Sequence, residues 1–160
     1  MPLLRYESVV SQPIDRVWAA FQDVSGLLPA LTPAAQQLKI ESADPLPPRL
    51  GTTVRLSVKG PFGRVRWTAV YTAFDPPHPT VTGIEARFVD EQTSGPFKRW
   101  SQSHEFEAAS DTTTCCIDVI DYAVPLGPLG RVADVVFVRR LVSRMFTERH
   151  RRMVDWFAGG

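Results

Sequence analysis

Residues 131–157 constrain the fold more than any other stretch, because they contain neither glycine nor proline. Apolar side chains recur there near helical spacing, as at Val135, Val138 and Val142. One helix over the whole stretch would be about 40 Å long, at ~1.5 Å per residue. A helix of that length can lie across an entire sheet. The sequence therefore predicts a long C-terminal helix of which one face covers a sheet.

The preceding part of the chain predicts that sheet. Glycine, proline and turn-forming polar residues divide residues 36–124 into segments rich in β-branched and aromatic residues. Six strands are expected, over 36–43, 52–59, 64–74, 80–89, 97–109 and 113–124. No helical segment separates these strands, so consecutive ones should pair antiparallel. A strand over 3–10 would make the sheet seven-stranded.

A short helix is expected directly after the first strand. Ser11 and Pro13 are typical helix-start residues, and Asp15 falls in the first turn, where the helix dipole favours a negative charge. Apolar residues then follow at spacings of three and four, at Ile14, Val17, Trp18 and Phe21. Residues 24–33 contain one glycine and two prolines, which limit helix length. We therefore expect only one or two further helical turns there before the chain becomes extended.

Length and charge limit the classes of function. With 160 residues, 44% of them hydrophobic, the chain is expected to form one domain over 1–160. A net charge of +1 gives no indication of a nucleic acid partner. No stretch approaches the ~18 apolar residues that span a bilayer, so we expect no stable membrane insertion and a cytoplasmic location. We also expect a monomer or homodimer. Cys115 and Cys116 are neighbours on a predicted strand and point to opposite faces, which predicts reduced thiols.

Four stretches have a pattern found in one protein family. They are PIDRVWAAF at 13–21, LTP at 31–33, FVDEQTSGPFKRWSQSHEFE at 88–107 and IDVIDYAVPLGPLG at 117–130. With the order of elements, they make nearly the whole chain resemble the bacterial branch of the START-like (SRPBCC) superfamily. This superfamily includes polyketide cyclases, coenzyme Q-binding proteins and lipid-transfer domains. The resemblance implies an α+β helix-grip fold, in which a curved antiparallel seven-stranded sheet wraps around the C-terminal helix and leaves a ligand cavity between them.

The last hairpin determines which side chains share the cavity face. A three-residue loop at 110–112 pairs His104 with Asp118, so that both side chains lie on one face. A two-residue loop pairs His104 with Ile117 instead, because a slip of one residue reverses every side chain. The spacing of Asp118, Ile120 and Tyr122 resembles the family pattern and favours the three-residue loop.

A histidine beside a carboxylate in a cavity has three possible roles. It can act as a general base, orient a ligand head group, or satisfy only its own hydrogen-bonding needs. The large aromatic side chains similarly either fill the core or face a ligand. The candidate ligand-binding residues are Trp67, Tyr71, Phe88, Trp100, His104, Phe106, Asp118, Ile120, Tyr122, Val142 and Phe146. The three histidines form no metal-ligand motif, and no nucleotide-binding or hydrolase motif is present, so no metal, cofactor or catalytic residue is assigned.

The leading interpretation is binding or transport of a hydrophobic small molecule, such as a lipid, an isoprenoid quinone or a polyketide-like compound, without catalysis. One alternative is a polyketide cyclase or aromatase that uses His104, Asp118 and Tyr122 for proton transfer. Another is an interaction module that docks through the C-terminal helix, where seven arginines accompany three acidic residues.

Overall fold

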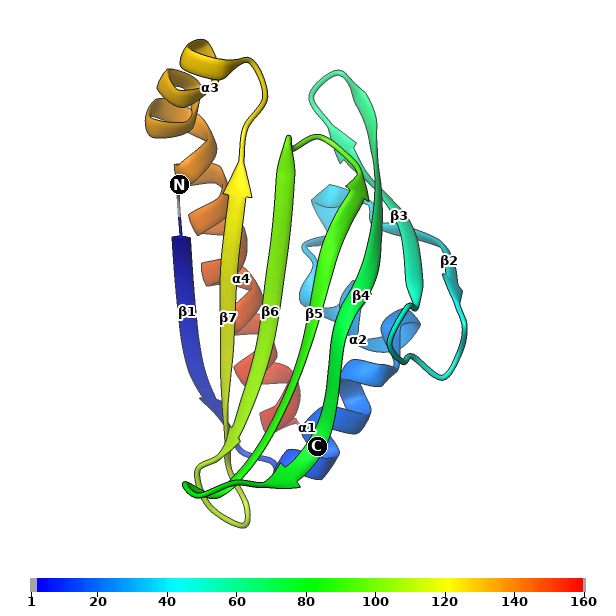
Figure 1. The fold of residues 1–160 in the computed structure, drawn as a ribbon, viewed down its shortest axis with the longest axis vertical. Helices are drawn as coiled ribbons and strands as arrows, with labels where there is room; N and C mark the ends of the chain where they lie inside the picture. Colours follow the sequence, from blue (N-terminus) through cyan, green and yellow to red (C-terminus); the bar gives the residue numbers. More distant parts are fainter. Residues whose placement is uncertain (1–2, 160) are drawn as a thin grey trace.

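One antiparallel sheet curves around a long C-terminal helix (Figure 1). The computed structural model describes residues 3–159. Its strands are β1 (Leu3–Val10), β2 (Lys39–Asp44), β3 (Thr53–Gly60), β4 (Gly63–Pro79), β5 (Ile84–Ser94), β6 (Arg99–Ala108) and β7 (Thr114–Ala123). They lie in the order β1-β7-β6-β5-β4-β3-β2, so every strand after β1 pairs with its neighbour in sequence. The predicted seven-stranded helix-grip fold is confirmed.

The central strands are longer than the sequence predicted. The segment 75–79 was expected as a turn, but it belongs to β4, and the pairing register with β5 shifts between Asp75 and His78. An irregularity there accommodates prolines, which have no N–H to donate to the sheet. Residues 90–94 were also expected as a turn, and they extend β5 instead. Asp90 consequently belongs to β5 and pairs with Tyr71 of β4. It follows Phe88 by two residues on the same strand, so both side chains lie on one face.

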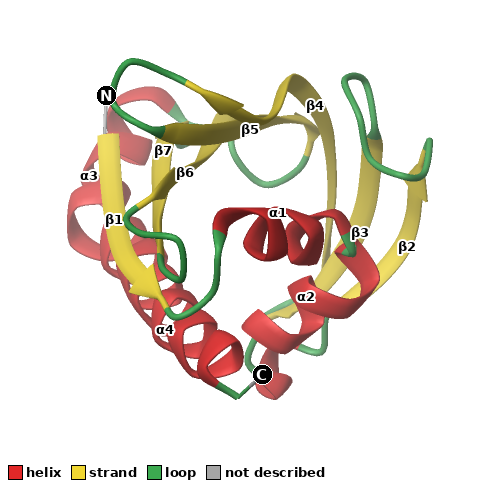
Figure 2. Ribbon diagram, turned by 90° about the horizontal axis from the view of Figure 1, so that it is seen from below, coloured by secondary structure: helices red, strands yellow, loops and turns green. Residues whose placement is uncertain are grey.

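Three short helical segments follow β1. Helix α1 spans Ile14–Gln22, α2 spans Val24–Leu31, and a single 3-10 turn covers Ala34–Gln36. The Asp23 carboxylate starts α2 by accepting a hydrogen bond from the backbone N–H of Gly26, at 3.1 Å. Figure 2 shows α1 and α2 inside the curve of the sheet, where they cover part of its concave face.

The C-terminal helical region begins earlier than predicted. It comprises α3 (Gly127–Ala133), a π-helical turn over Asp134–Val138, and α4 (Arg139–Ala158). Gly130 permits the early start, because a Cβ atom there would lie 1.9 Å from the carbonyl oxygen of Pro125. At the π-helical turn, the buried Asp134 carboxylate accepts a 2.6 Å hydrogen bond from the Tyr122 hydroxyl. This bond fastens the helix to the end of β7.

The last hairpin has the predicted three-residue loop. His104 pairs with Asp118, Trp100 pairs with Tyr122, and the N–H of Ala109 donates to the carbonyl of Thr113. The alternative two-residue register is therefore wrong. The cysteines are both free thiols, as predicted, with Cys116 buried and Cys115 half-buried on the other face. Within residues 3–159, no helix combines the length and the apolar character that a bilayer crossing requires.

Candidate functional site

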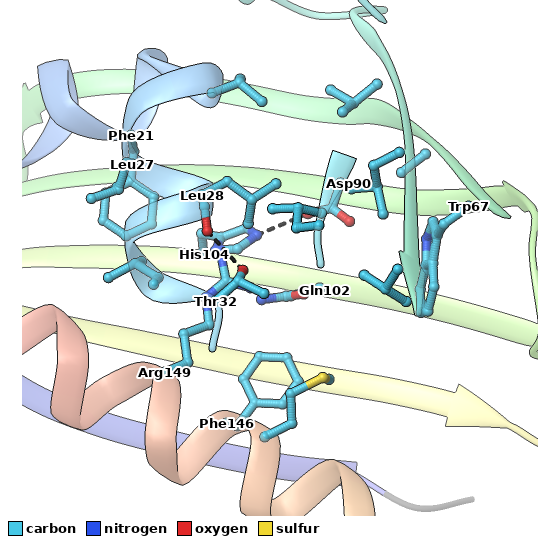
Figure 3. A pocket seen from close by; sticks show the side chains of 18 of the residues that line it. Phe21, Leu27, Leu28, Thr32, Trp67, Asp90, Gln102, His104, Phe146 and Arg149 are labelled. Atoms are coloured by element: carbon cyan, nitrogen blue, oxygen red, sulfur yellow. Dashed lines mark hydrogen bonds and ion pairs between the residues drawn. The ribbon is translucent and has the colours of Figure 1, made fainter. Parts of the chain in front are cut away.

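A cavity of about 210 Å³ lies between the concave face of the sheet, α2 and α4 (Figure 3). Most of its wall is apolar. Helix α2 contributes Leu27 and Leu31, four residues apart on one helical face, and α4 contributes Met145 and Phe146. The polar residues of the wall are Thr32, Gln36, Asp90, Gln102, His104 and Arg149.

Six of the eleven candidate residues line this cavity. They are Trp67, Tyr71, Phe88, Trp100, His104 and Phe146. Four aromatic rings among them, from β4, β5 and β6, form flat walls. Phe88 stacks on Tyr71 with ring centroids 5.2 Å apart, and Trp67 meets Trp100 edge-on at 5.0 Å. The sheet thus offers broad aromatic surfaces to the cavity.

The other five candidates lie elsewhere in the interior. Phe106 is covered by α1, with its ring centroid 4.8 Å from that of Phe21. Ile120, Tyr122 and Val142 belong to a core cluster in which α4 packs on the β1, β6 and β7 side of the sheet. Asp118 is buried beneath His104 and does not line the cavity. Of the candidates His104, Asp118 and Tyr122, only His104 therefore faces the cavity, where Asp90 and Gln102 accompany it.

A chain of polar groups leads from the cavity into the core. His104 Nε2 lies 2.8 Å from Asp90 Oδ2, and His104 Nδ1 lies 2.9 Å from Asp118 Oδ1. The second contact pairs charges but is not aligned as a hydrogen bond. Asp118 Oδ2 then lies 2.8 Å from His150 Nε2, and His150 Nδ1 lies 2.8 Å from Ser8 Oγ. The chain therefore connects β5, β6, β7, α4 and β1.

Three members of this chain, Asp90, His150 and Ser8, were not among the candidate residues. Asp90 lay in a predicted turn, although its separation of two from Phe88 would have placed both side chains on one face of a longer strand. His150 lies on the C-terminal helix, far in sequence from its carboxylate partner Asp118. It follows Phe146 by four residues and precedes Met153 by three, so it lies on the buried stripe of α4. That spacing was the available signal.

Opposing influences act on the titration of His104 and Asp118. Burial acts to lower the pKa of His104, but the carboxylates of Asp118 and Asp90 outweigh it, and the net shift is upward. Burial acts to raise the pKa of Asp118, but His104 and the hydrogen bond from His150 bring it well below its usual value. Asp118 is therefore ionised at neutral pH, and the two carboxylates favour the protonated form of His104. A protonated imidazole has no free lone pair, so His104 is suited to donate a proton rather than to act as the general base considered from sequence.

The three residues of the cyclase hypothesis do not converge on the cavity. Only His104 faces it. The Tyr122 hydroxyl donates to Asp134, and burial together with that carboxylate raises the pKa of Tyr122. Tyr122 is thus committed to holding the helix against β7.

Arg149 brings a positive charge to the opposite wall of the cavity. Its side chain reaches from α4 into the cavity (Figure 3), and its guanidinium carbon lies 5.8 Å from the centroid of the Phe146 ring. No carboxylate within residues 3–159 forms an ion pair with it at 4.0 Å or less. The same part of the chain contains no group of three histidine, cysteine or acidic side chains arranged to hold a metal ion.

The stability of the protein should fall as the pH rises above neutral. His104 binds its proton more tightly in the folded protein than in the unfolded chain, where the pKa is about 6.5. Its stabilising contribution is therefore fully present below that pH and is lost as the pH rises through the folded pKa. Urea denaturation between about pH 6 and 8.5 would measure the free energy of unfolding against pH. In His104→Gln this free energy should fall less steeply with pH than in the wild-type protein. His78→Gln, which alters an exposed histidine, should keep the wild-type slope; equal slopes in both variants would contradict the assignment.

Sequence comparison assigns the chain to a family. Residues 1–156 match the model of the family described as polyketide cyclase / dehydrase and lipid transport. The chain belongs to this family. A search of curated protein sequences found no match.

Several solved structures share the fold of this family member. The Zhui aromatase/cyclase from Streptomyces sp. R1128 is 16% identical, with a TM-score of 0.70 over 98% of this chain and 93% of that chain. A START superfamily protein from Mycobacterium smegmatis is 12% identical, with a TM-score of 0.66 over 98% and 97%. A norcoclaurine synthase point mutant from Thalictrum flavum is 14% identical, with a TM-score of 0.62 over 96% and 94%. Identities this low show the shared fold alone. The predicted START-like resemblance is supported by the family match over residues 1–156.

Proposed function

We propose that the protein binds a hydrophobic small molecule, such as a lipid, an isoprenoid quinone or a polyketide-like compound, in the cavity between the sheet, α2 and α4. The observation that carries the proposal is the cavity itself, because small-molecule sites are concave, mainly apolar and supplied with a few polar groups. The aromatic walls at Trp67, Tyr71, Phe88 and Trp100 favour a flat or elongated apolar body.

The size and polarity of the cavity limit the ligand. Its volume of about 210 Å³ is below the ~300–1,000 Å³ of sites for drug-sized molecules, so it accommodates a compact ring system or one segment of a longer chain. Asp90 and His104 on one wall and Arg149 on another supply charged groups for a polar end. We expect a ligand with an apolar body and one polar head.

A cavity-filling substitution tests the site. Ala69 is buried in β4 and lines the cavity, so Ala69→Phe places a ring in the space that the ligand would occupy. Native mass spectrometry with solvent extraction should identify a compound retained by the wild-type protein. Binding of menadione, a flat quinone, and of palmitic acid can be followed by quenching of tryptophan fluorescence and by calorimetry. Ala69→Phe should weaken binding at least about tenfold, because the introduced ring fills the cavity and the ligand can no longer bury its apolar surface there.

The control adds the same bulk outside the cavity. Thr68 precedes Ala69 on β4 and points to the other face of the sheet, so Thr68→Phe should leave binding unchanged. Circular dichroism would verify that both variants fold. The proposal fails if the wild-type protein retains no compound and binds neither probe, or if Ala69→Phe binds as well as Thr68→Phe.

A second candidate function is catalysis of the polyketide cyclase or aromatase type. It is favoured by one observation: His104 lies at the cavity wall with its Nε2 2.8 Å from Asp90 Oδ2. The neighbouring carboxylates raise the pKa of His104, which suits a general acid. Turnover of a poly-β-ketone thioester that falls strongly in His104→Gln, with binding retained, would favour it. A substrate bound by the wild-type protein and released unchanged would exclude it for that substrate.

A further inference from the structure

Large apolar side chains are exposed to solvent along the connection from β7 to α4. Leu126 and Leu129 begin the helical region, and Val132, Val136 and Phe137 continue it, each at least 63% exposed. Only a narrow stripe of this segment, at Gly130, Asp134 and the half-buried Val138, faces the rest of the protein. Apolar residues that cluster in this way indicate an interaction surface.

A second apolar tip lies at the same end of the molecule. Phe62 is fully exposed in the turn between β3 and β4. Gly60 pairs with Gly63 at this turn, and Arg99 pairs with Ala123 where β6 begins and β7 ends. In Figure 1 the β3–β4 turn and α3 both lie at the upper end of the sheet. Two segments far apart in sequence therefore place exposed apolar residues at one end of the molecule.

The same end is strongly basic. Its three segments, residues 57–67, 94–100 and 124–147, contain nine of the 18 lysines and arginines of the chain. Their single acidic residue is Asp134, which is buried and bound by Tyr122. Arg140 and Arg144 form no ion pair within residues 3–159, whereas Arg151, farther along α4, is paired with Glu148 and Asp155.

These features fit one kind of partner better than another copy of the protein. In a two-fold symmetric dimer the same surface lies on both sides, so the basic residues of one copy would face those of the other. An anionic bilayer interface accommodates apolar side chains and attracts arginine at its headgroups. We propose that this end of the molecule, formed by the β3–β4 turn, the β5–β6 loop and residues 126–144, is a docking surface for anionic membranes.

Docking here involves no spanning segment. Phe62 and the apolar residues of 126–137 insert at the headgroup boundary, and Arg139, Arg140 and Arg144 follow them along the helix to contact lipid phosphates and carboxylates. Trp67 and Trp100 in the cavity wall lie close in sequence to the turns of this end. The bound orientation therefore brings that part of the cavity toward the lipid.

Vesicle co-sedimentation of the full chain, with no ligand added, tests the surface independently of what the cavity holds. Binding is expected to vesicles of phosphatidylcholine mixed with phosphatidylserine, to be weak on phosphatidylcholine alone, and to fall as salt is raised. Phe62→Asp and Leu129→Asp should each weaken binding at least about tenfold, because each removes the burial of a large apolar side chain. Arg140→Glu and Arg144→Glu should each weaken it about fivefold or more.

Two variants serve as matched controls. Val81 is also fully exposed in a hairpin turn, but it lies between β4 and β5 at the opposite end of the sheet, so Val81→Asp should bind like the wild type. Arg49→Glu makes the corresponding charge change in the exposed loop before β3. The proposal is overturned if the wild-type protein binds neither kind of vesicle. It is also overturned if Phe62→Asp binds as well as Val81→Asp. A dimer in light scattering that Leu129→Asp converts to a monomer, without vesicle binding by the wild type, overturns it in favour of self-association.

Discussion

Replacing Asp118 with asparagine is expected to lower the free energy of unfolding by about 3–5 kcal/mol near neutral pH, the usual cost of removing one partner from a buried ion pair. Asp118 is only 5% exposed, and its carboxylate faces His104 and His150 together with the side-chain amide of Gln102. Asparagine has nearly the same shape, so the substitution removes charge without opening a void.

The asparagine amide cannot replace the carboxylate, because it has one acceptor oxygen and one donor nitrogen. Gln102 donates to Oδ1 and His150 contacts Oδ2, so the amide nitrogen would face one of these side chains whichever way it turned. His104 would also lose the carboxylate that contributes most to raising its pKa. It would release its proton more readily, so the destabilisation should be smaller at alkaline than at neutral pH.

Urea denaturation followed by circular dichroism at several pH values would measure this effect. The matched control is Asp121→Asn on the same strand. Asp121 forms a 2.7 Å ion pair with Arg99 at the surface, where both side chains are more than a third exposed, and such pairs contribute about 1 kcal/mol or less. If Asp118→Asn cost no more than Asp121→Asn, the polar chain through Asp118 would not be a major source of stability.

The strands that carry His104 and Asp118 could be predicted because local rules determine them. The length of the 110–112 loop sets the register, and the register sets which side chains share a face. Asp90 could not be placed in the same way. Its segment contains turn-forming residues and becomes a strand only because β4 and β6 lie on either side to pair with it.

The location of the cavity was beyond sequence reasoning for a different reason. Periodicity shows which face of the C-terminal helix is apolar, but not which strands that face covers. In the folded protein α4 packs on the side of β1 and β7, so Ile120, Tyr122 and Val142 fill the core. The space over β3 to β6 is left to α2, and the residues facing it form the cavity wall. Whether such a space is filled depends on side-chain volumes from elements far apart in the chain.

The arginines of the C-terminal helical region fall into two groups that differ in their ion pairs. Glu148 pairs with both Arg151 and Arg152, so the C-terminal half is neutralised by its own acidic residues. The N-terminal half keeps its arginines unpaired among exposed apolar residues, within the part of the chain that the structure describes. The interaction-module alternative therefore applies to one end of the helical region and is compatible with a ligand in the cavity.

Phe146 joins the core to the cavity, and Phe146→Ala is expected to lower the free energy of unfolding by about 3–5 kcal/mol. Its ring is 1% exposed and stacks on Tyr6, with centroids 5.4 Å apart, and on Trp100 at 6.1 Å. Alanine would remove these contacts. The space released would adjoin the existing cavity, since Phe146 is part of its wall. The variant should therefore be less stable and have a larger site.

Thermal and urea denaturation with and without palmitic acid would test both consequences. A ligand that fills the enlarged site should recover part of the lost stability, because binding to the folded state adds to its free energy of unfolding. Phe137→Ala is the matched control, since Phe137 is 65% exposed in the same helical region and its removal should change stability by no more than about 0.5 kcal/mol. Equal losses in the two variants would contradict the role of Phe146 in the core. A Phe146→Ala protein that gained no more stability from palmitic acid than the wild type would show that the released space had collapsed rather than enlarged the cavity.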